Sequence, residues 1–246
     1  MFNLTPRQIA ILRALIDEYI NTAIPVGSEP LERKYNLGVS PATIRNEMSV
    51  LVQQGFLKQP HSSSGRIPTA ISYRLYISEL MEESQLPVME EVALKERIWD
   101  HRNSLNDLLE HTVKSLAESI KFLVVGYVQD GYIHTSGHAY LLDLPEFFDI
   151  DVTRKVLTLV DQEIDQLKTW VETSFASAGH QDQVHIVFGE ELEEPFLEPV
   201  GMVYGRFMVE GSHPGRLVVV GPARMNFAQV LPRVRYFCQL IDELTV

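Results

Sequence analysis

The 246-residue sequence predicts an α+β protein in two parts, a small helical part followed by a larger one built around a mostly antiparallel sheet. Residues 1–81 hold closely spaced helix-start signals and one polar loop, which predicts a small helical domain. Residues 103–246 mix apolar stripes at helical spacing with short, strand-like apolar runs. The polar, proline-containing stretch that begins at Glu82 marks the boundary, and we expect 82–102 to be a connecting segment.

Three helices are expected at the start of the first part. The first covers Pro6–Ile20, and the second covers Ser28–Tyr35. Ser40 followed by Pro41 is a cap-then-proline pair, so a third helix is expected to begin there and to end at Gly55.

A strand, a polar loop and a second strand are expected after the third helix. Phe56–Gln59 alternates in polarity like a strand, and His61–Arg66 is polar with a glycine near its end. Ile67–Thr69 can return as a short edge strand, where a proline is tolerated. Ala70–Met81 is expected to be a fourth helix. Helix, strand and loop in this order are typical of a winged helix-turn-helix domain, in which the loop is the wing.

The third helix presents two different faces. Ile44, Met48 and Leu51 recur at intervals of four and three residues and are expected to point inward. The polar residues that fall off this stripe are expected to face outward, namely Thr43, Arg45, Asn46 and Ser49.

Helices and strands also alternate in the second part. A hairpin is expected over Phe122–Val128, a turn at Asp130 and Gly131, and a strand from Tyr132 onward. Cys238 lies in an apolar helical pattern and is expected to be a small buried side chain. The other expected elements are helices over Asn103–Ile120, Val152–Val171 and Phe227–Leu244 and strands over Val184–Phe188, Gly201–Val209 and Gly215–Val220.

The charge is distributed unevenly along the chain. The formal net charge is −12, but residues 1–81 hold eight basic and six acidic residues, a net of +2. The segment from Arg33 to Arg74 contains six basic residues and a single acidic one, Glu47. Exposed charges more than about 8 Å apart are largely screened at physiological salt, so a distant acidic part does not prevent contact with a polyanion. The first part can therefore bind nucleic acid.

Three features of the first part predict DNA binding. The third helix begins with small residues, so its amino terminus can approach a phosphate. Arg45 and Asn46 follow one turn later, and these side chains suit guanine and adenine edges. The wing is polar and ends in Arg66, which suits contact with the DNA backbone or minor groove. The candidate DNA-binding residues are Ser40, Pro41, Ala42, Thr43, Arg45, Asn46, Ser49, Lys58, His61, Ser62, Ser63, Gly65 and Arg66.

Other classes of function find less support in the sequence. Winged helices also serve as protein-interaction modules, and that alternative stays open. No nucleophile elbow, phosphate-binding loop or dinucleotide fingerprint occurs, so we expect neither an enzyme nor a cofactor. His134 and His138 lack companion ligands, so we expect no metal site. A single cysteine, no secretory signal and no membrane-length apolar run indicate a soluble cytoplasmic protein.

The first part resembles a known family. The segments TPRQIAIL, LGVSPATIRNEM, SSSGRIPT and YRLYI, spread between Thr5 and Met81, resemble the DNA-binding domain of the heat-inducible transcription repressor HrcA. The segment GRLVVVGPARMNFAQVLPRVRY resembles the GAF-like effector domain of the same family, which would also serve in dimerisation. A further block resembles that domain at Gly137, Leu141, Leu142, Pro145, Glu146 and Phe147.

The resemblance implies a dimer that binds an inverted-repeat operator in double-stranded DNA and represses chaperone operons. It also implies dependence on a GroEL-type chaperonin. The chain is shorter than a typical member, because a tight turn between Val128 and His134 replaces much of an inserted dimerising region. One alternative remains open, a regulator of other genes whose GAF-like part binds a small ligand between strands in 184–220.

Overall fold

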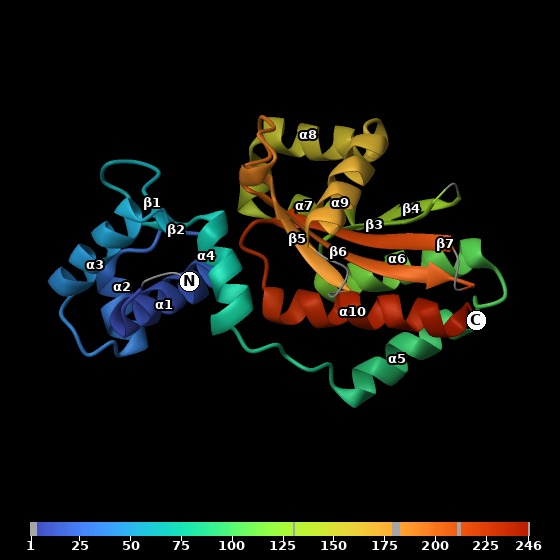
Figure 1. Cartoon of the computed structure of the whole chain (residues 1–246), viewed down its shortest axis with the longest axis horizontal. Coiled ribbons are helices and arrows are strands. Elements are labelled where there is room, and N and C mark those ends of the chain that lie inside the picture. The colour runs from blue at the N-terminus through green and yellow to red at the C-terminus, as the bar shows by residue number, and fades with distance from the viewer. Residues whose placement is uncertain (1–3, 130, 179–182, 211–212, 246) are drawn as a thin grey trace. The chain divides into compact units, whose positions relative to one another are not determined.

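The computed structural model describes residues 4–129, 131–178, 183–210 and 213–245 (Figure 1). The chain divides into two compact units between Glu82 and Glu83. The units before and after this boundary are called unit 1 and unit 2. Helices and antiparallel strands occur together in the structure, so the α+β class is confirmed.

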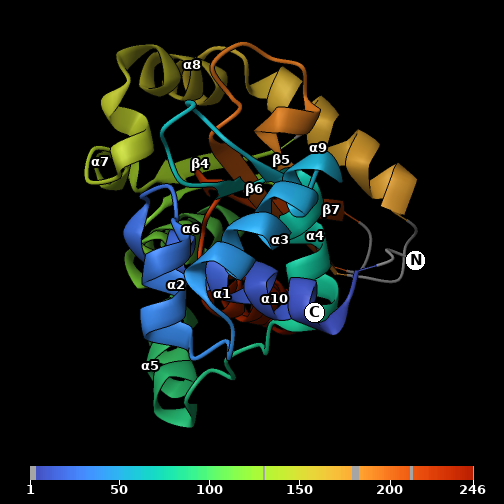
Figure 2. The ribbon, with the colours of Figure 1, turned by 90° about the vertical axis from the view of Figure 1, so that its left-hand side faces the viewer.

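Unit 1 begins with three helices that pack on one another, α1 (Pro6–Thr22), α2 (Ser28–Tyr35) and α3 (Pro41–Gln53) (Figure 2). They form where the caps and apolar spacing predict them. Leucines and isoleucines from all three helices meet in one core, which is why each helix turns its apolar stripe inward. The fully buried side chains include Ile11, Leu12, Leu15, Leu31 and Ile44.

A two-stranded antiparallel sheet follows α3 in unit 1. Strand β1 (Leu57–Lys58) pairs with β2 (Ile67–Pro68), and residues 59–66 form the loop between them. Helix α4 (Ala70–Leu75) then continues as one π-helical turn, η1 (Tyr76–Leu80), where we expected a single α-helix. At the start of this turn the Tyr76 hydroxyl donates to Asp17 Oδ1 of α1 at 2.6 Å, so the turn is tied to α1.

Unit 2 is built on a five-stranded sheet in which every neighbouring pair is antiparallel. The strand order is β4-β3-β7-β6-β5. The hairpin predicted around Asp130 is confirmed as β3 and β4, although Asp130 itself lies outside the described residues. The strands are β3 (Leu123–Val128), β4 (Ile133–Ser136), β5 (Val184–Phe188), β6 (Val200–Val209) and β7 (His213–Pro222).

Helices cover both faces of this sheet (Figure 1). Helices α6 (Leu105–Ile120) and α10 (Phe227–Leu244) pack on one face. Two strand glycines allow this close approach, because a Cβ on Gly205 would lie 2.5 Å from Cys238 Sγ and one on Gly126 would collide with Val113. Cys238 is fully buried there, as predicted, and burial raises the pKa of its thiol.

The other face carries α8 (Ile150–Asp161) and α9 (Ile164–Ala178). The prediction of one long helix over Val152–Val171 is wrong, because the chain breaks at Gln162 and Glu163. Both of their amides donate to the Thr158 carbonyl, at 2.8 and 3.0 Å. Gln162 and Glu163 at this break are polar, whereas the apolar side chains of α8 and α9 are buried against the sheet.

Four helices among the described residues were not predicted. The expected connecting segment 82–102 contains α5 (Val88–Trp99), which belongs to unit 2 and buries Leu94 and Ile98. The others are α7 (His138–Leu141), η2 (Pro145–Phe148) and η3 (Gly189–Glu191). Within the described residues, no helix has both the length and the apolarity that a bilayer crossing requires.

Candidate nucleic-acid interface

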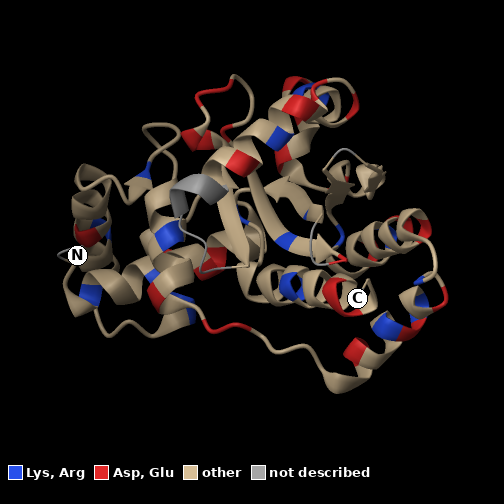
Figure 3. Ribbon diagram, turned by 45° about the vertical axis from the view of Figure 1, so that its right-hand side comes forward, with Lys and Arg blue, Asp and Glu red and all other residues tan. Residues whose placement is uncertain are grey.

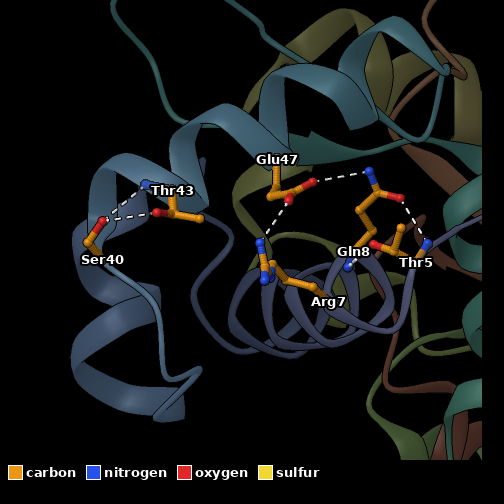
Figure 4. Close-up of polar contacts among 6 residues, drawn as sticks. All are labelled: Thr5, Arg7, Gln8, Ser40, Thr43 and Glu47. Carbon is orange, nitrogen blue, oxygen red and sulfur yellow. Dashed lines mark hydrogen bonds and ion pairs between the residues drawn. The ribbon is translucent and has the colours of Figure 1, made fainter.

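The amino terminus of α3 is capped by side chains and is open to solvent (Figure 4). Ser40 Oγ accepts a hydrogen bond from the Thr43 amide at 3.3 Å and lies 3.1 Å from Thr43 Oγ1. Pro41 occupies the first helical position, where its missing N–H costs nothing. Ser40 and Ala42 are exposed, so an anion can approach the remaining free amides of the first turn.

The next turn of α3 separates apolar from polar side chains as predicted. Ile44 and Met48 are buried against the core, whereas Arg45 and Asn46 are exposed. Thr43 and Ser49 are partly exposed, and Ser49 Oγ donates to the Arg45 carbonyl at 3.0 Å. A guanidinium and an amide therefore stand together on the solvent side of one helix.

Helix α3 contains one acidic residue, Glu47, and its side chain points toward α1 (Figure 4). Glu47 Oε1 lies 3.5 Å from Arg7, and Glu47 Oε2 accepts from Gln8 Nε2 at 3.1 Å. Gln8 is itself held by a capping box with Thr5 at the start of α1. Because α1 neutralises Glu47, this carboxylate adds little repulsion beside Arg45.

Other carboxylates of unit 1 are also bound internally. Buried Glu18 accepts from Lys34 Nζ at 2.6 Å and from the Tyr35 hydroxyl at 3.2 Å, which joins α1 to α2. Burial, followed by the nearby Glu18 charge, raises the pKa of Tyr35 to about 12. In contrast, unit 2 displays acidic segments along its loops and helix ends (Figure 3).

The loop between β1 and β2 is shaped by its own hydrogen bonds. Gln59 Nε2 donates to the carbonyls of Ser62 and Ser64, at 2.8 and 3.0 Å. Ser64 Oγ donates to the His61 carbonyl at 2.7 Å and lies 3.0 Å from the His61 amide, whose bond it accepts. The exposed side chains of His61, Ser62 and Ser63 are thus presented by a loop with a defined backbone.

The end of the loop is fixed to the segment before α2. Arg66 and Val26 exchange two backbone hydrogen bonds of 2.8 and 2.9 Å. A Cβ on Gly65 would lie 2.5 Å from the carbonyl oxygens of Pro25 and Val26, so this crossing requires glycine. Arg66 is only partly exposed, and its Nη1 donates to the Ser64 carbonyl at 3.2 Å.

A groove of about 380 Å³ lies between α3 and this loop. Of the predicted site residues it brings together Arg45, Ser62, Ser63, Gly65 and Arg66. The remaining predicted residues do not line it. The groove also includes residues that the sequence did not single out, namely Val26, Gly27, Ser28, Met48, Gln59 and Ser64.

Of the groove residues that the sequence did not single out, Gly27 and Ser28 lie at the start of α2. Ser28 had been recognised as a helix start, but its proximity to the loop depends on the Val26–Arg66 bridge, which pairs residues 40 positions apart. As for metals, no cluster of three potential ligands occurs in the described part of the chain. His134 Nε2 instead lies 2.9 Å from Asn106 Oδ1.

A family model described as the HrcA protein C terminal domain matches residues 57–231, more than half of the chain. The chain belongs to the HrcA family. The heat-inducible transcription repressor HrcA of Desulforudis audaxviator is 26% identical over 337 aligned positions, covering 97% of each chain. These positions outnumber the 246 residues here, so that HrcA relative contains segments with no counterpart in this chain.

A second relative matches more closely over a shorter stretch. The heat-inducible transcription repressor HrcA of Carboxydothermus hydrogenoformans is 47% identical over 119 residues, which cover 48% of this chain and 35% of that protein. A crystal structure of a hypothetical protein matches the fold with a TM-score of 0.75 at 16% identity, covering 99% of both chains. The resemblance to heat-inducible transcription repressors is therefore confirmed.

Proposed function

We propose that this HrcA-family chain represses heat-shock chaperone operons by binding, as a dimer, an inverted-repeat operator in double-stranded DNA. One observation carries the proposal most directly: Arg45 and Asn46 are exposed together on α3, while Glu47 is neutralised by α1. Family membership agrees with a repressor, since its relatives are named heat-inducible transcription repressors. The proposal gives the chain no catalytic step and no cofactor.

In this proposal unit 1 is a winged helix-turn-helix domain. Helix α3 enters the major groove, and the 59–66 loop is the wing that lies along the neighbouring backbone. Unit 2 is then a reduced GAF-like effector and dimerisation domain. Residues 1–81 are the proposed DNA-binding domain. Of the predicted connecting segment 82–102, residues 83–102 are assigned to unit 2 because they contain α5.

The candidate residues then divide by role. The capped amino terminus of α3, Ser40 to Thr43, meets a phosphate, and Arg45 and Asn46 meet base edges with Ser49 beside them. The wing residues His61, Ser62, Ser63, Gly65 and Arg66, together with Lys58, position the protein on the backbone without reading sequence.

Base reading is tested by changing Arg45 or Asn46 to alanine. Each change should weaken operator binding by about 1–3 kcal/mol and relax preference at one base position, since a bidentate pair is lost. Binding is measured on the inverted repeat upstream of a chaperone operon and on a scrambled duplex at the same salt concentration. An equal loss on both DNAs would refute a base-reading role.

Backbone contact is tested through the dependence of affinity on salt. Lys58→Ala or Arg66→Ala should weaken binding on every sequence and lower the salt slope by about one. The matched control is Arg13→Ala, which removes an exposed cation of α1 away from the groove. If the slope with Lys58→Ala equals that of the control, Lys58 does not contact phosphate.

The proposal places the protein in the cytoplasm, with a GroEL-type chaperonin that maintains its active state. Heat would divert the chaperonin to unfolded clients, active repressor would fall, and the operons would open. The ligand-sensing alternative needs an apolar cavity at strands 184–220. There Met202, Tyr204 and Val218 are fully buried in a continuous cluster with α8 and α9, which supports a packed sheet instead.

A further inference from the structure

The first residues of unit 2 form an extended segment that is bound to helix α10. Residues 83–87, here called the strap, contain neither helix nor strand and lead into α5 (Figure 1). Arg235 of α10 donates to both carboxylate oxygens of Glu83, at 2.7 and 3.1 Å. The Ser84 amide donates to the Ala228 carbonyl, in the first turn of α10, at 3.0 Å. Side chain and backbone together therefore fasten the strap.

A proline in α10 prepares the acceptor for the Ser84 amide. In an α-helix the carbonyl of each residue accepts from the amide four residues later, which for Ala228 is residue 232. That residue is Pro232, which lies inside α10 and has no N–H. The Ala228 carbonyl therefore lacks its helical donor, and the Ser84 amide of the strap takes this place.

Unit 1 ends at a fastened residue directly before the strap. The Met81 amide donates to the Tyr76 carbonyl at 2.8 Å and closes the turn η1, which the Tyr76 hydroxyl ties to Asp17 of α1. Glu83 is already bound to α10. A single residue, Glu82, therefore connects the last fastened residue of unit 1 to the first fastened residue of unit 2.

The strap is held more weakly than the helix that follows it. The side chains of Glu83 and Arg235 are 40% and 39% exposed, so solvent weakens their attraction although the pair is bidentate. Leu86 is the one buried side chain of the strap. Helix α5 is held by its buried inner face and by Glu90, which binds Arg233 at 2.8 and 3.0 Å. The strap can therefore leave α10 while α5 stays in place.

Release of the strap lengthens the connection between the units. With the strap bound, the connection is Glu82, and one residue spans at most about 3.6 Å. With the strap released, residues 82–87 connect Met81 to α5 and span at most about 22 Å. A longer flexible connection widens the range that unit 1 can reach and lowers its effective concentration at any one position.

We propose that Glu83 and Arg235 are positioning residues that determine how strictly the repressor selects the spacing between its two half-sites. This inference rests on the proposed function, in which two copies of unit 1 occupy an inverted repeat. With the strap bound in both copies, the two short connections allow a narrow range of spacings. With the strap released, both connections lengthen and altered spacings are accepted. Neither residue contacts DNA, because both act through the length of the connection.

Hydrogen exchange of the full chain tests whether the strap is fastened. The Ser84 amide, followed by mass spectrometry in a peptide that contains residues 82–87, should exchange about fivefold faster in Arg235→Ala. Arg154→Ala is the matched control, since Arg154 forms a similarly exposed ion pair with Asp151, within α8. If the Ser84 amide exchanges equally fast in both variants, the ion pair does not hold the strap and the proposal is overturned.

A charge swap separates the ion pair from other effects of losing Arg235. Arg235→Glu alone places two carboxylates together and should speed the exchange, as should Glu83→Arg alone. The double variant, Glu83→Arg with Arg235→Glu, restores an ion pair of reversed polarity and should return exchange to within about twofold of the natural chain. Continued fast exchange in the double variant would contradict a fastening role for this pair.

Binding to inverted repeats of altered spacing tests the role in DNA recognition. Affinity is measured on the inverted repeat upstream of a chaperone operon and on the same repeat with one to three base pairs added between the half-sites. The ratio of the two affinities should be about fivefold smaller for Arg235→Ala than for Arg154→Ala, and the charge swap should restore it. Equal ratios for the two alanine variants would refute a role in spacing.

A single half-site distinguishes this inference from the proposed function. One half-site contacts unit 1 alone, so Arg235→Ala should bind it as the natural chain does. If the natural chain binds neither the half-site nor the inverted repeat, the proposed function fails and the spacing role fails with it. If the natural chain binds the inverted repeat but accepts added base pairs as readily as Arg235→Ala, only the spacing role is wrong.

Discussion

The two units use ion pairs in opposite ways. In unit 1 two carboxylates beside the core are paired internally, since Glu18 binds Lys34 and Glu47 binds Arg7. Asp17 accepts a hydrogen bond from the Tyr76 hydroxyl. In unit 2 the basic residues are neutralised, since at least nine of its 13 Lys and Arg residues lie in ion pairs with its own carboxylates. One unit therefore exposes cations, and the other exposes anions.

This difference shows why the net charge of −12 is a poor guide to the partner of this protein. A polyanion responds to charges within roughly a Debye length, and there the relevant groups are Arg45 and the loop beside it. The negative surface of unit 2 disfavours nonspecific contact with DNA outside unit 1. The following predictions test the comparison, from the largest expected effect to the smallest.

The largest effect is expected where unit 2 encloses an ion pair. Arg224 binds Glu146 through two hydrogen bonds of 2.5 and 3.1 Å, and both side chains are mostly buried. Glu146→Gln should lower the free energy of unfolding of unit 2 by about 3–5 kcal/mol, because it leaves a buried cation. Urea unfolding followed by tryptophan fluorescence reports on unit 2, which contains both tryptophans, Trp99 and Trp170.

The control for this change is Glu118→Gln. Glu118 lies 3.4 Å from Arg97, and both side chains are about half exposed. Its loss should cost less than about 1 kcal/mol. If the two variants unfold at the same urea concentration, burial does not separate these ion pairs and this part of the comparison is wrong.

A smaller effect is expected where unit 1 depends on backbone shape instead of charge. Gly65→Ala should break the Val26–Arg66 bridge, whose two backbone hydrogen bonds together contribute about 1–3 kcal/mol. DNA affinity should fall with it on every sequence, because the 59–66 loop is displaced. Gly131→Ala, in unit 2 and away from the groove, is the control, since its Cβ would meet only Val128 and Gln129 at ordinary distances of 3.5 Å or more. Normal DNA binding by Gly65→Ala would show that the bridge does not position the 59–66 loop for DNA contact.

Removing the internal carboxylate of α3 should affect stability more than DNA binding. Glu47→Gln should cost unit 1 about 1 kcal/mol through its contacts with Arg7 and Gln8. Operator affinity should stay nearly unchanged, because this charge is already neutralised. Far-UV circular dichroism measures the loss, and Glu32→Gln, on exposed α2, is the silent control. A large gain in affinity would mean that Glu47 still repels DNA in the native chain.

The smallest effect concerns pH and the start of unit 2. The hydrogen bond from Arg235, 2.7 Å from Glu83, lowers the pKa of Glu83 below its ordinary value of 4.5. Its stabilisation is fully present above pH 4.5 and is lost as the pH falls through the lowered value. The difference in Tm between the natural chain and Glu83→Gln should be small at pH 7, because both side chains are partly exposed, and should vanish in acid. A difference that grows in acid would contradict this sign.

Local signals predicted unit 1 better than unit 2. The caps at Thr5 and Ser40 and the spacing of Ile44, Met48 and Leu51 were sufficient for α1 and α3, because these effects act within one or two turns. The break at Gln162 could not be predicted. The apolar residues before and after Gln162 keep the spacing of a single helix. The chain divides into α8 and α9 only because each packs separately on the sheet.

The sequence alone determined the elements of unit 1, the outward placement of Arg45 and Asn46, and membership of the HrcA family, because each depends on short-range pattern. Only the tertiary structure decided what lies beside those residues. The groove needs Val26 against Arg66, the neutral face of α3 needs Glu47 against Arg7, and the strap at the start of unit 2 needs Glu83 against Arg235. Contacts between residues far apart in the chain leave no periodic trace in the sequence, so their geometry appears only once the chain is folded.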